Sequence, residues 1–202
     1  MGDLVLYGSI YSRTFTARWI LEELELPYRV VETDIREGHQ KSPEFLAVNP
    51  MGKVPALTDD GVVITECPAI CLYLADRYGL GRLAPAFDDA RRAPYLRWAV
   101  FATAVLEPAI YLREEKLAPR GVGWADYDTA LNALETGLAD GPWLVGDMFT
   151  AADVALGAVL SVALYNKRVT HRPLLEAYDR RLAARPAYKR ALNANWPPAP
   201  PS

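Results

Sequence analysis

The sequence predicts a protein of two parts, an α/β domain over residues 1–78 followed by an all-α domain over residues 88–202. In the first part, short apolar runs bounded by glycine or proline alternate with helical stripes. In the second part, helical periodicity continues and no strand pattern interrupts it. A stretch containing Gly81 and Pro85, residues 79–87, is the predicted linker between the two domains.

The α/β domain is predicted to run βαβ and then ββα. Residues 4–7 are an apolar run typical of a buried strand, and a helical stripe follows and ends at Pro27. Residues 28–33 predict a second strand. It is parallel to the first because a crossover helix joins the two. The parallel pair is therefore expected at the start of the sheet.

The second half of this domain is predicted from turn and cap signals. Ser42 followed by Pro43 and Glu44 indicates the start of a short helix. Asp60-Gly61 stands between two apolar runs, which predicts a hairpin. Pro68 is expected to open the last helix of the domain.

The helical domain begins with one long helical pattern over residues 88–117, which Pro108 is expected to kink or divide. Residues 126–139 predict the next helix. Thr150 with Asp153 three positions later predicts a capping box at the start of a helix that is apolar on most sides and therefore buried.

Two prolines and a proline-rich tail complete the chain. Pro173 and Pro186 are each expected to start a further short helix. The tail over residues 197–201 is predicted to be extended.

Composition excludes several classes of protein. The chain has 202 residues, a net charge of −3 and 51% apolar residues, which are globular values with no basic stretch for nucleic acid. No apolar run is long enough to span a membrane, and residues 1–20 lack the apolar core of a signal peptide. Cys67 and Cys71 are the only cysteines, which indicates neither a disulfide framework nor a metal site. We expect a cytoplasmic protein with no metal, membrane or nucleic-acid partner.

Four motifs in order carry a resemblance to the cytosolic glutathione transferase family over nearly the whole chain. They are residues 21–28 (LEELELPY), 49–57 (NPMGKVPAL), 65–70 (TECPAI) and 149–153 (FTAAD). The resemblance implies a thioredoxin-like domain followed by an all-helical domain, glutathione as co-substrate and a homodimer. The spacing of the glutathione-site motifs is similar to bacterial, theta-like members that use serine or tyrosine.

The residues of the second and third motifs suit a peptide ligand with an amino-acid head group. Val54 precedes a proline at a strand entrance, so its backbone can pair with an extended ligand; the family implies a cis bond to Pro55. Glu66 and Cys67 lie at a helix N-terminus, whose free N–H groups favour binding of the ligand's carboxylate. The negative charge of Glu66 can bind the ligand's ammonium group. The family usually has serine where this chain has Cys67, and a thiol is a weaker donor.

The glycyl carboxylate of glutathione requires cations. Lys53 is the first candidate because it adjoins Val54, with Lys41 and Gln40 in the neighbouring loop. Arg13 could steady either this carboxylate or the thiolate.

A hydroxyl near the sulfur would stabilise the thiolate of glutathione, whose thiol has a pKa of about 8.5 when free. The candidates are Ser12 first and Tyr11 second, in the loop after the first strand, and Tyr7 third, at the end of that strand. The loop contains no cysteine, which argues against a mixed disulfide with the protein.

A hydrophobic electrophile is expected against the long helix that follows the linker. Its candidate contacts are Trp98, Phe101, Val105, Tyr111, Arg113 and Tyr165. A glutathione-dependent isomerase or dehalogenase, or a non-catalytic binding module, is the alternative. For the dimer that the family implies, the candidate contact surfaces are the helix bearing Ile70, Tyr73 and Arg77 and the long helix near Arg91 and Tyr95.

Overall fold

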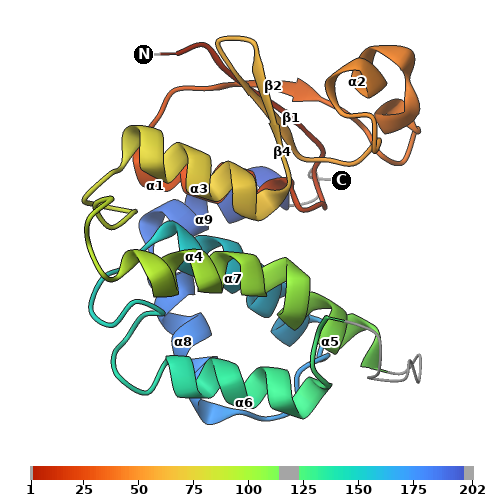
Figure 1. The fold of residues 1–202 in the computed structure, drawn as a ribbon. Coiled ribbons are helices and arrows are strands. Elements are labelled where there is room, and N and C mark those ends of the chain that lie inside the picture. Colours follow the sequence, from red (N-terminus) through yellow and green to blue (C-terminus); the bar gives the residue numbers. More distant parts are fainter. Residues whose placement is uncertain (1, 114–122, 198–202) are drawn as a thin grey trace. The chain divides into compact units, whose positions relative to one another are not determined.

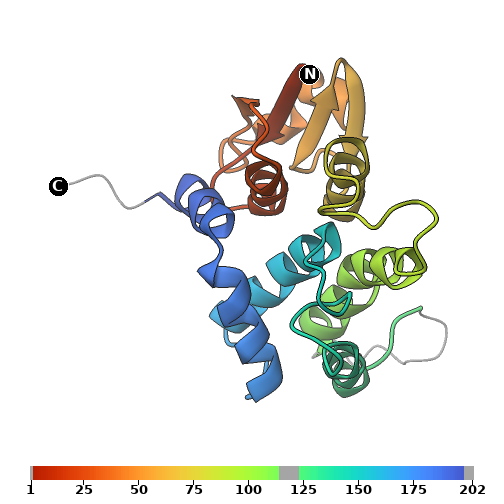
Figure 2. The same ribbon diagram turned by 90° about the vertical axis from the view of Figure 1, so that its left-hand side faces the viewer.

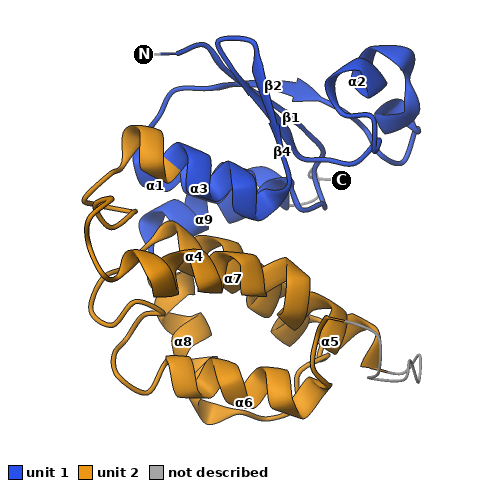
Figure 3. Cartoon of the chain, viewed as in Figure 1, with its two compact units in different colours: residues 1–74, 185–202 blue, residues 75–184 orange. Residues whose placement is uncertain are grey.

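The computed structural model describes residues 2–113 and 123–197. The chain divides into two compact units, which Figure 3 draws in different colours. The first unit consists of residues 1–74 together with residues 185–202, and the second of residues 75–184. The last helix of the chain therefore belongs to the same unit as the sheet.

The first unit is built on a four-stranded mixed sheet with strand order β2-β1-β3-β4. Its strands are β1 (Leu4–Gly8), β2 (Arg29–Glu32), β3 (Ala56–Asp59) and β4 (Val62–Thr65). β1 and β2 are parallel, whereas β1–β3 and β3–β4 are antiparallel. This is the predicted thioredoxin-like arrangement. Both the βαβ unit and the hairpin at Asp60-Gly61 are confirmed.

The helices of this unit are α1 (Thr14–Leu24), η1 (His39–Lys41), α2 (Pro43–Val48), α3 (Cys67–Tyr78), whose last turn falls in the second unit, and α9 (Pro186–Asn195). In Figures 1 and 2, α1 and α3 lie on the same side of the sheet. The cap at Ser42 is confirmed, since its side chain accepts a hydrogen bond from the backbone N–H of Phe45.

α1 is buried on nearly every side, and α9 packs along it. The Phe15 ring packs edge-on to Tyr188 at 5.1 Å between centroids, and Trp19 packs on the same tyrosine at 4.9 Å. Such aromatic pairs add to the free energy already gained by burying the rings. α9 is therefore fixed along α1.

The second unit contains α4 (Arg92–Phe101), η2 (Ala102–Leu106), α5 (Glu107–Tyr111), α6 (Tyr127–Gly137), α7 (Ala151–Tyr165) and α8 (Pro173–Ala184). The helix expected over residues 88–117 begins at Arg92, and residues 114–117 lie outside the described residues. The interruption predicted at Pro108 is confirmed, as a π-helical segment just before it. Proline lacks an N–H and clashes with the carbonyl four residues earlier, which widens the preceding turn.

α7 is the central helix of the second unit, and residues 151–161 are all buried. Thr150 and Asp153 form the predicted capping box. Asp153 also accepts hydrogen bonds from the backbone N–H of Leu144 at 2.9 Å and the hydroxyl of Tyr178 at 2.9 Å. Its carboxylate thus holds three segments of the unit together.

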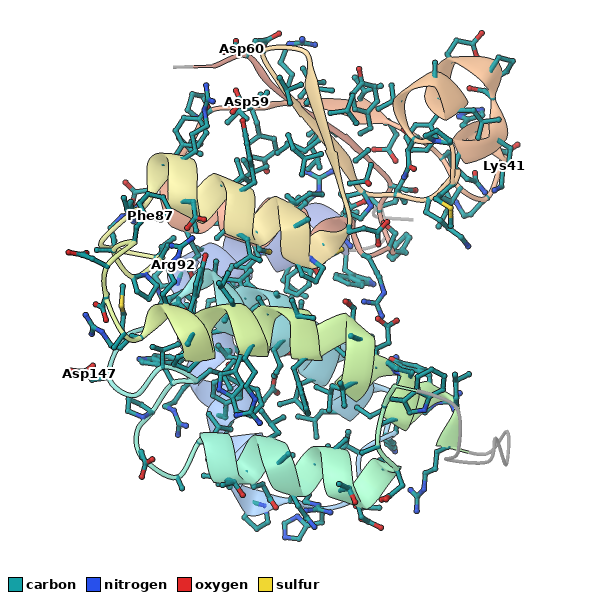
Figure 4. The ribbon with its side chains drawn as sticks, viewed as in Figure 1. Lys41, Asp59, Asp60, Phe87, Arg92 and Asp147 are labelled. Atoms are coloured by element: carbon teal, nitrogen blue, oxygen red, sulfur yellow. The ribbon has the colours of Figure 1, made fainter. Side chains whose placement is uncertain are left out.

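Arg92 fixes the start of α4. Its guanidinium donates to Asp76 at 2.8 Å and lies 4.6 Å from the centroid of the Phe87 ring, a pair visible in Figure 4. Such a cation over a ring is attracted by the ring's electron density.

Ile70 and Tyr95, on the two helices predicted to face a dimer partner, are completely buried within a single chain. A partner would therefore contact other residues of these helices. Within residues 2–113 and 123–197, no helix is both long and apolar enough to cross a membrane. The predicted extended tail lies almost wholly outside the described residues, which end at Pro197.

Candidate functional site

Three segments of the first unit emerge at the same end of the sheet. Tyr7 in β1 pairs with Ala56 in β3, and Ala56 pairs in turn with Thr65 in β4. The segment after β1, the segment before β3 and the segment after β4 therefore start side by side. All of the predicted glutathione-binding motifs are on these segments or on the loops that contact them.

The segment after β1 brings a hydroxyl to the N-terminus of α1. Ser12 Oγ is half-buried and accepts a hydrogen bond from the Thr14 backbone N–H at 3.1 Å. It also lies 2.6 Å from the Ser9 carbonyl oxygen and 2.8 Å from Thr14 Oγ1. Gly8 allows this packing, because a Cβ there would lie 2.3 Å from the Thr14 methyl group.

The two tyrosine candidates occupy different surroundings. Tyr11 is 49% exposed, has a positive φ of 56° and lies directly before Ser12. Tyr7 is half-buried and packs edge-on to Phe45 of α2, with ring centroids 6.3 Å apart. Tyr11 therefore shares the loop of Ser12, whereas Tyr7 faces α2.

The N-terminus of α3 contacts the same loop. Cys67 begins the helix, is 8% exposed, and its Sγ lies 3.8 Å from the Arg13 carbonyl oxygen. Glu66 precedes it with φ of 67° and is exposed. The first N–H groups of a helix have no partner within it, so this end can receive an anion. Cys71, one turn later, is completely buried, and burial raises the pKa of its thiol well above the ordinary value.

The segment before β3 contains the cis peptide bond that the resemblance implied, between Val54 and Pro55. Val54 is half-buried and Lys53 is exposed. Buried Asn49 braces this segment, donating from Nδ2 to the Lys53 carbonyl at 2.7 Å and accepting from the Met51 N–H at 3.1 Å. The backbone of Lys53 and Val54 is thus held at a fixed position beside β3.

The side chain of Lys41 extends from η1 to the segment before β3. Its Nζ donates to the Met51 carbonyl at 3.2 Å, and Figure 4 labels this side chain. Gly52 has φ of +61°, and a Cβ there would lie 2.6 Å from Lys41 Nζ and 2.9 Å from the Gln40 carbonyl oxygen. Gln40 Oε1 is buried with no partner among the described residues. Lys41 and Gln40 therefore lie beside the segment that carries Lys53.

An open pocket of about 490 Å³ lies elsewhere in the first unit. Its lining includes Tyr7 and His39, together with Val31, Glu32, Thr33, Ser42, Glu44, Phe45 and Val48. Neither Ser12, Val54 nor Cys67 contributes to it. Tyr7 is thus directed to a different part of the domain from the Ser12 loop.

The six residues predicted to contact a second substrate belong to the second unit and differ in exposure. Trp98 is 2% exposed and packs on Phe101, with ring centroids 5.1 Å apart. The Arg113 guanidinium lies 4.1 Å from the centroid of the Tyr127 ring. Val105 and Tyr111 are half-buried, whereas Tyr165 is 87% exposed.

Sequence reasoning missed three residues that organise these segments: Thr14, Asn49 and Asn195. Thr14 could have been found, because a hydroxyl at a helix start is a known signal. Asn195 Nδ2 donates to the Ser12 carbonyl at 3.0 Å, and no local pattern indicates a contact across 183 residues. Among the residues described, no group of three or more potential metal-ligating side chains occurs.

Two family models match this chain. The model of the glutathione S-transferase N-terminal domain matches residues 2–76, and that of the glutathione S-transferase C-terminal domain matches residues 112–194. Both halves of the sequence are therefore recognised.

Relatives and solved structures agree with these matches. The chain is 31% identical to glutathione S-transferase 3 of Zea mays, with 100% of this chain and 99% of that protein covered. It is 30% identical to the disulfide-bond oxidoreductase YfcG of Escherichia coli, covering 85% and 86%. The theta class glutathione S-transferase of Xanthomonas axonopodis pv. citri, solved with glutathione bound, has a TM-score of 0.73 and 28% identity, covering 95% and 98%. This chain belongs to the glutathione S-transferase family.

Proposed function

We propose that this protein is a glutathione transferase that activates the thiol of glutathione for attack on a hydrophobic electrophile. In this proposal, residues 1–78 bind glutathione and residues 88–184 bind the second substrate, while residues 185–202 belong to the first unit. The observation that carries the proposal is the position of Ser12 Oγ at the N-terminus of α1, with the α3 N-terminus in contact with the same loop. A thiolate placed there would meet a hydroxyl donor and the positive end of a helix dipole.

Glutathione would bind as an extended peptide along the three segments. The backbone of Val54, held beside cis-Pro55, pairs with the ligand's central peptide. The γ-glutamyl carboxylate lies at the N–H groups of Cys67 and the following turn, and Glu66 faces the ammonium. Lys53, Lys41 and Gln40 bind the glycyl carboxylate, and Arg13 adds positive charge near the thiolate.

Ser12 is the first choice for the activating group. Its oxygen already accepts the Thr14 N–H, and its single proton can turn from the Ser9 carbonyl to a thiolate. Tyr11 is the second choice because it shares the loop and is exposed. Tyr7 is the third. A hydroxyl of this kind matches the serine- or tyrosine-type, theta-like spacing of the motifs.

The test is the pKa of bound glutathione, measured from thiolate ultraviolet absorbance against pH. We expect Ser12→Ala to raise this pKa by about one unit, equivalent to about 1.4 kcal/mol of thiolate stabilisation. Tyr11→Phe should have a smaller effect and Tyr7→Phe none. A shift in Tyr7→Phe alone would contradict the assignment, and failure to bind immobilised glutathione would contradict the transferase proposal itself.

The second substrate would contact the exposed and half-buried parts of the α4–α5 region. Of the predicted residues, Phe101, Val105, Tyr111 and Arg113 retain accessible surface, as does Tyr165 of α7, while Trp98 supports them from the core. Turnover of a panel of aryl halides by wild type and by Val105→Trp tests this. A variant with unchanged KM values across the panel would contradict the assignment.

A second candidate function is disulfide reduction, because the Escherichia coli relative is named a disulfide-bond oxidoreductase. The loop at Ser12 contains no cysteine, so the sulfur atoms would come from glutathione. Two molecules of glutathione would reduce a disulfide RSSR to two thiols and form one molecule of oxidised glutathione. Comparing turnover of a small disulfide with turnover of an aryl halide separates the two functions.

We further propose a cytoplasmic homodimer, as is usual in the family. Exposed apolar side chains such as Met51, Phe87 and Val100 are available for association. Sedimentation equilibrium should give twice the chain mass of 22.4 kDa. A monomer mass at micromolar concentration would contradict the dimer.

A further inference from the structure

Asn195, the last residue of α9, lies against the loop that carries Ser12. It is completely buried. The helix reaches this position because it packs along α1, where Phe15 contacts Tyr188 and also Trp196, the residue after Asn195, at 5.4 Å between ring centroids. Figure 3 shows α9 as part of the unit that contains the sheet. The end of α9 is therefore fixed beside the start of α1.

Asn195 binds two consecutive residues of the loop. Its Nδ2 donates to the Ser12 carbonyl at 3.0 Å, and its own backbone carbonyl accepts the Tyr11 N–H at 2.9 Å. Tyr11 has φ of 56°, a conformation that costs a residue with a Cβ free energy unless its surroundings hold it there. One residue of α9 thus fixes both the strained Tyr11 and the peptide that follows Ser12.

The side-chain amide of Asn195 is a poor choice for stability alone. Its Oδ1 is buried and has no hydrogen-bond partner among the described residues. A buried carbonyl without a partner loses its hydration and gains nothing in return. A leucine of nearly the same shape would avoid that loss and would give up the Nδ2 bond to the Ser12 carbonyl, so what the amide adds is its hold on the loop rather than net stability.

We propose that Asn195 is a positioning residue for thiol activation, acting through Ser12. By holding the Tyr11 N–H and the Ser12 carbonyl, it fixes the peptide before Tyr11 and the peptide after Ser12, which limits the rotation of the backbone between them. The direction of Ser12 Oγ, which lies 3.1 Å from the Thr14 N–H, follows from that rotation. This inference rests on the proposed function, because it assigns Asn195 no chemistry apart from Ser12.

The test replaces both polar atoms with methyl groups of similar shape. Asn195→Leu should retain its thermal unfolding midpoint and its Kd for glutathione within about twofold. The pKa of the bound thiol should rise by about half a unit, a roughly threefold smaller thiolate fraction near neutral pH. Asn193→Leu is the matched control, since Asn193 is an exposed asparagine of the same helix, two positions earlier, and it should leave the pKa unchanged.

The Ser12→Ala variant separates the two levels of the proposal. A raised pKa in Ser12→Ala together with an unchanged pKa in Asn195→Leu would overturn the role of Asn195 and leave the transferase proposal standing. An unchanged pKa in both would refute Ser12 as the activating group, and the role of Asn195 with it. If Asn195→Leu does not fold, Asn195→Ala takes its place, with the same pKa shift expected and the same outcomes overturning it.

Discussion

Glu23 and Arg185 are 162 residues apart in the sequence and form a two-bond ion pair inside the first unit, at 2.6 and 2.7 Å. The Glu23 side chain is 7% exposed and that of Arg185 28%. Trp19 donates its indole N–H to the same carboxylate at 2.9 Å. The pair joins α1 to the residue that precedes α9, so it fixes the helix that carries Asn195.

Arg185→Ala should destabilise the protein strongly. It leaves the buried Glu23 carboxylate without its cation, and such a loss costs about 3 kcal/mol. Arg190→Ala is the control, because the Arg190–Glu22 pair is more exposed and its loss should cost less than about 1 kcal/mol. Urea unfolding of both variants measures the difference. Equal losses in the two variants would contradict the importance of the buried pair.

Gly52→Ala should weaken glutathione binding. The new Cβ would meet Lys41 Nζ at 2.6 Å and the Gln40 carbonyl at 2.9 Å, which displaces two of the proposed carboxylate ligands. The positive φ adds a strain of about 1–2 kcal/mol. Gly61→Ala carries the same strain, with φ of +83° and no neighbour within 4 Å. Calorimetry should show a higher Kd in Gly52→Ala only; an equal rise in both would exclude the close approach as the cause.

Asp153 should make stability fall as pH rises from about 4 to 6. Burial raises its pKa to about 6 from 3.8, against the hydrogen bonds that favour the ionised form. In this window the folded state binds the proton more tightly than the unfolded state, so raising the pH costs the folded state roughly 3 kcal/mol.

Asp153→Asn removes this titration while the other carboxylates remain. The difference in unfolding free energy between wild type and variant should therefore shrink as the pH rises from 4 to 6. Urea unfolding at each pH measures it, and a difference independent of pH would show that the raised pKa is wrong.

Cys67→Ser should tighten glutathione binding. A hydroxyl is a stronger hydrogen-bond donor than a thiol, and a gain of about 1 kcal/mol corresponds to a roughly fivefold lower Kd. Cys71→Ser is the control, since it should lower stability and leave the Kd unchanged because Cys71 is buried one turn away. If Cys67→Ser leaves the Kd unchanged, position 67 does not contact the ligand.

Local signals predicted most of the individual elements. The caps at Ser42 and Thr150 and the turn at Asp60-Gly61 depend on hydrogen bonds and backbone angles within a few residues. They can therefore be predicted from a short stretch of sequence. The interruption of the helix at Pro108 was predicted, but its π-helical form was not. Which helical turn widens into a π-helix depends on how the surrounding residues pack. The burial of Ile70 and Tyr95 also escaped prediction. A helix pattern shows which residues are apolar but not which neighbours cover them.

The sequence by itself determined the order of strands and helices, the family resemblance and the candidate residues of the glutathione site. Only the tertiary structure decided that α9 returns to α1, that Asn195 holds the Ser12 loop and that Tyr7 faces α2. Caps, turns and hydrophobic periodicity are interactions between residues close in the chain, which leave a local pattern. Contacts such as that of Asn195 with Ser12 form between segments far apart in the sequence and depend on how whole helices pack. They therefore cannot be predicted from any short stretch of sequence.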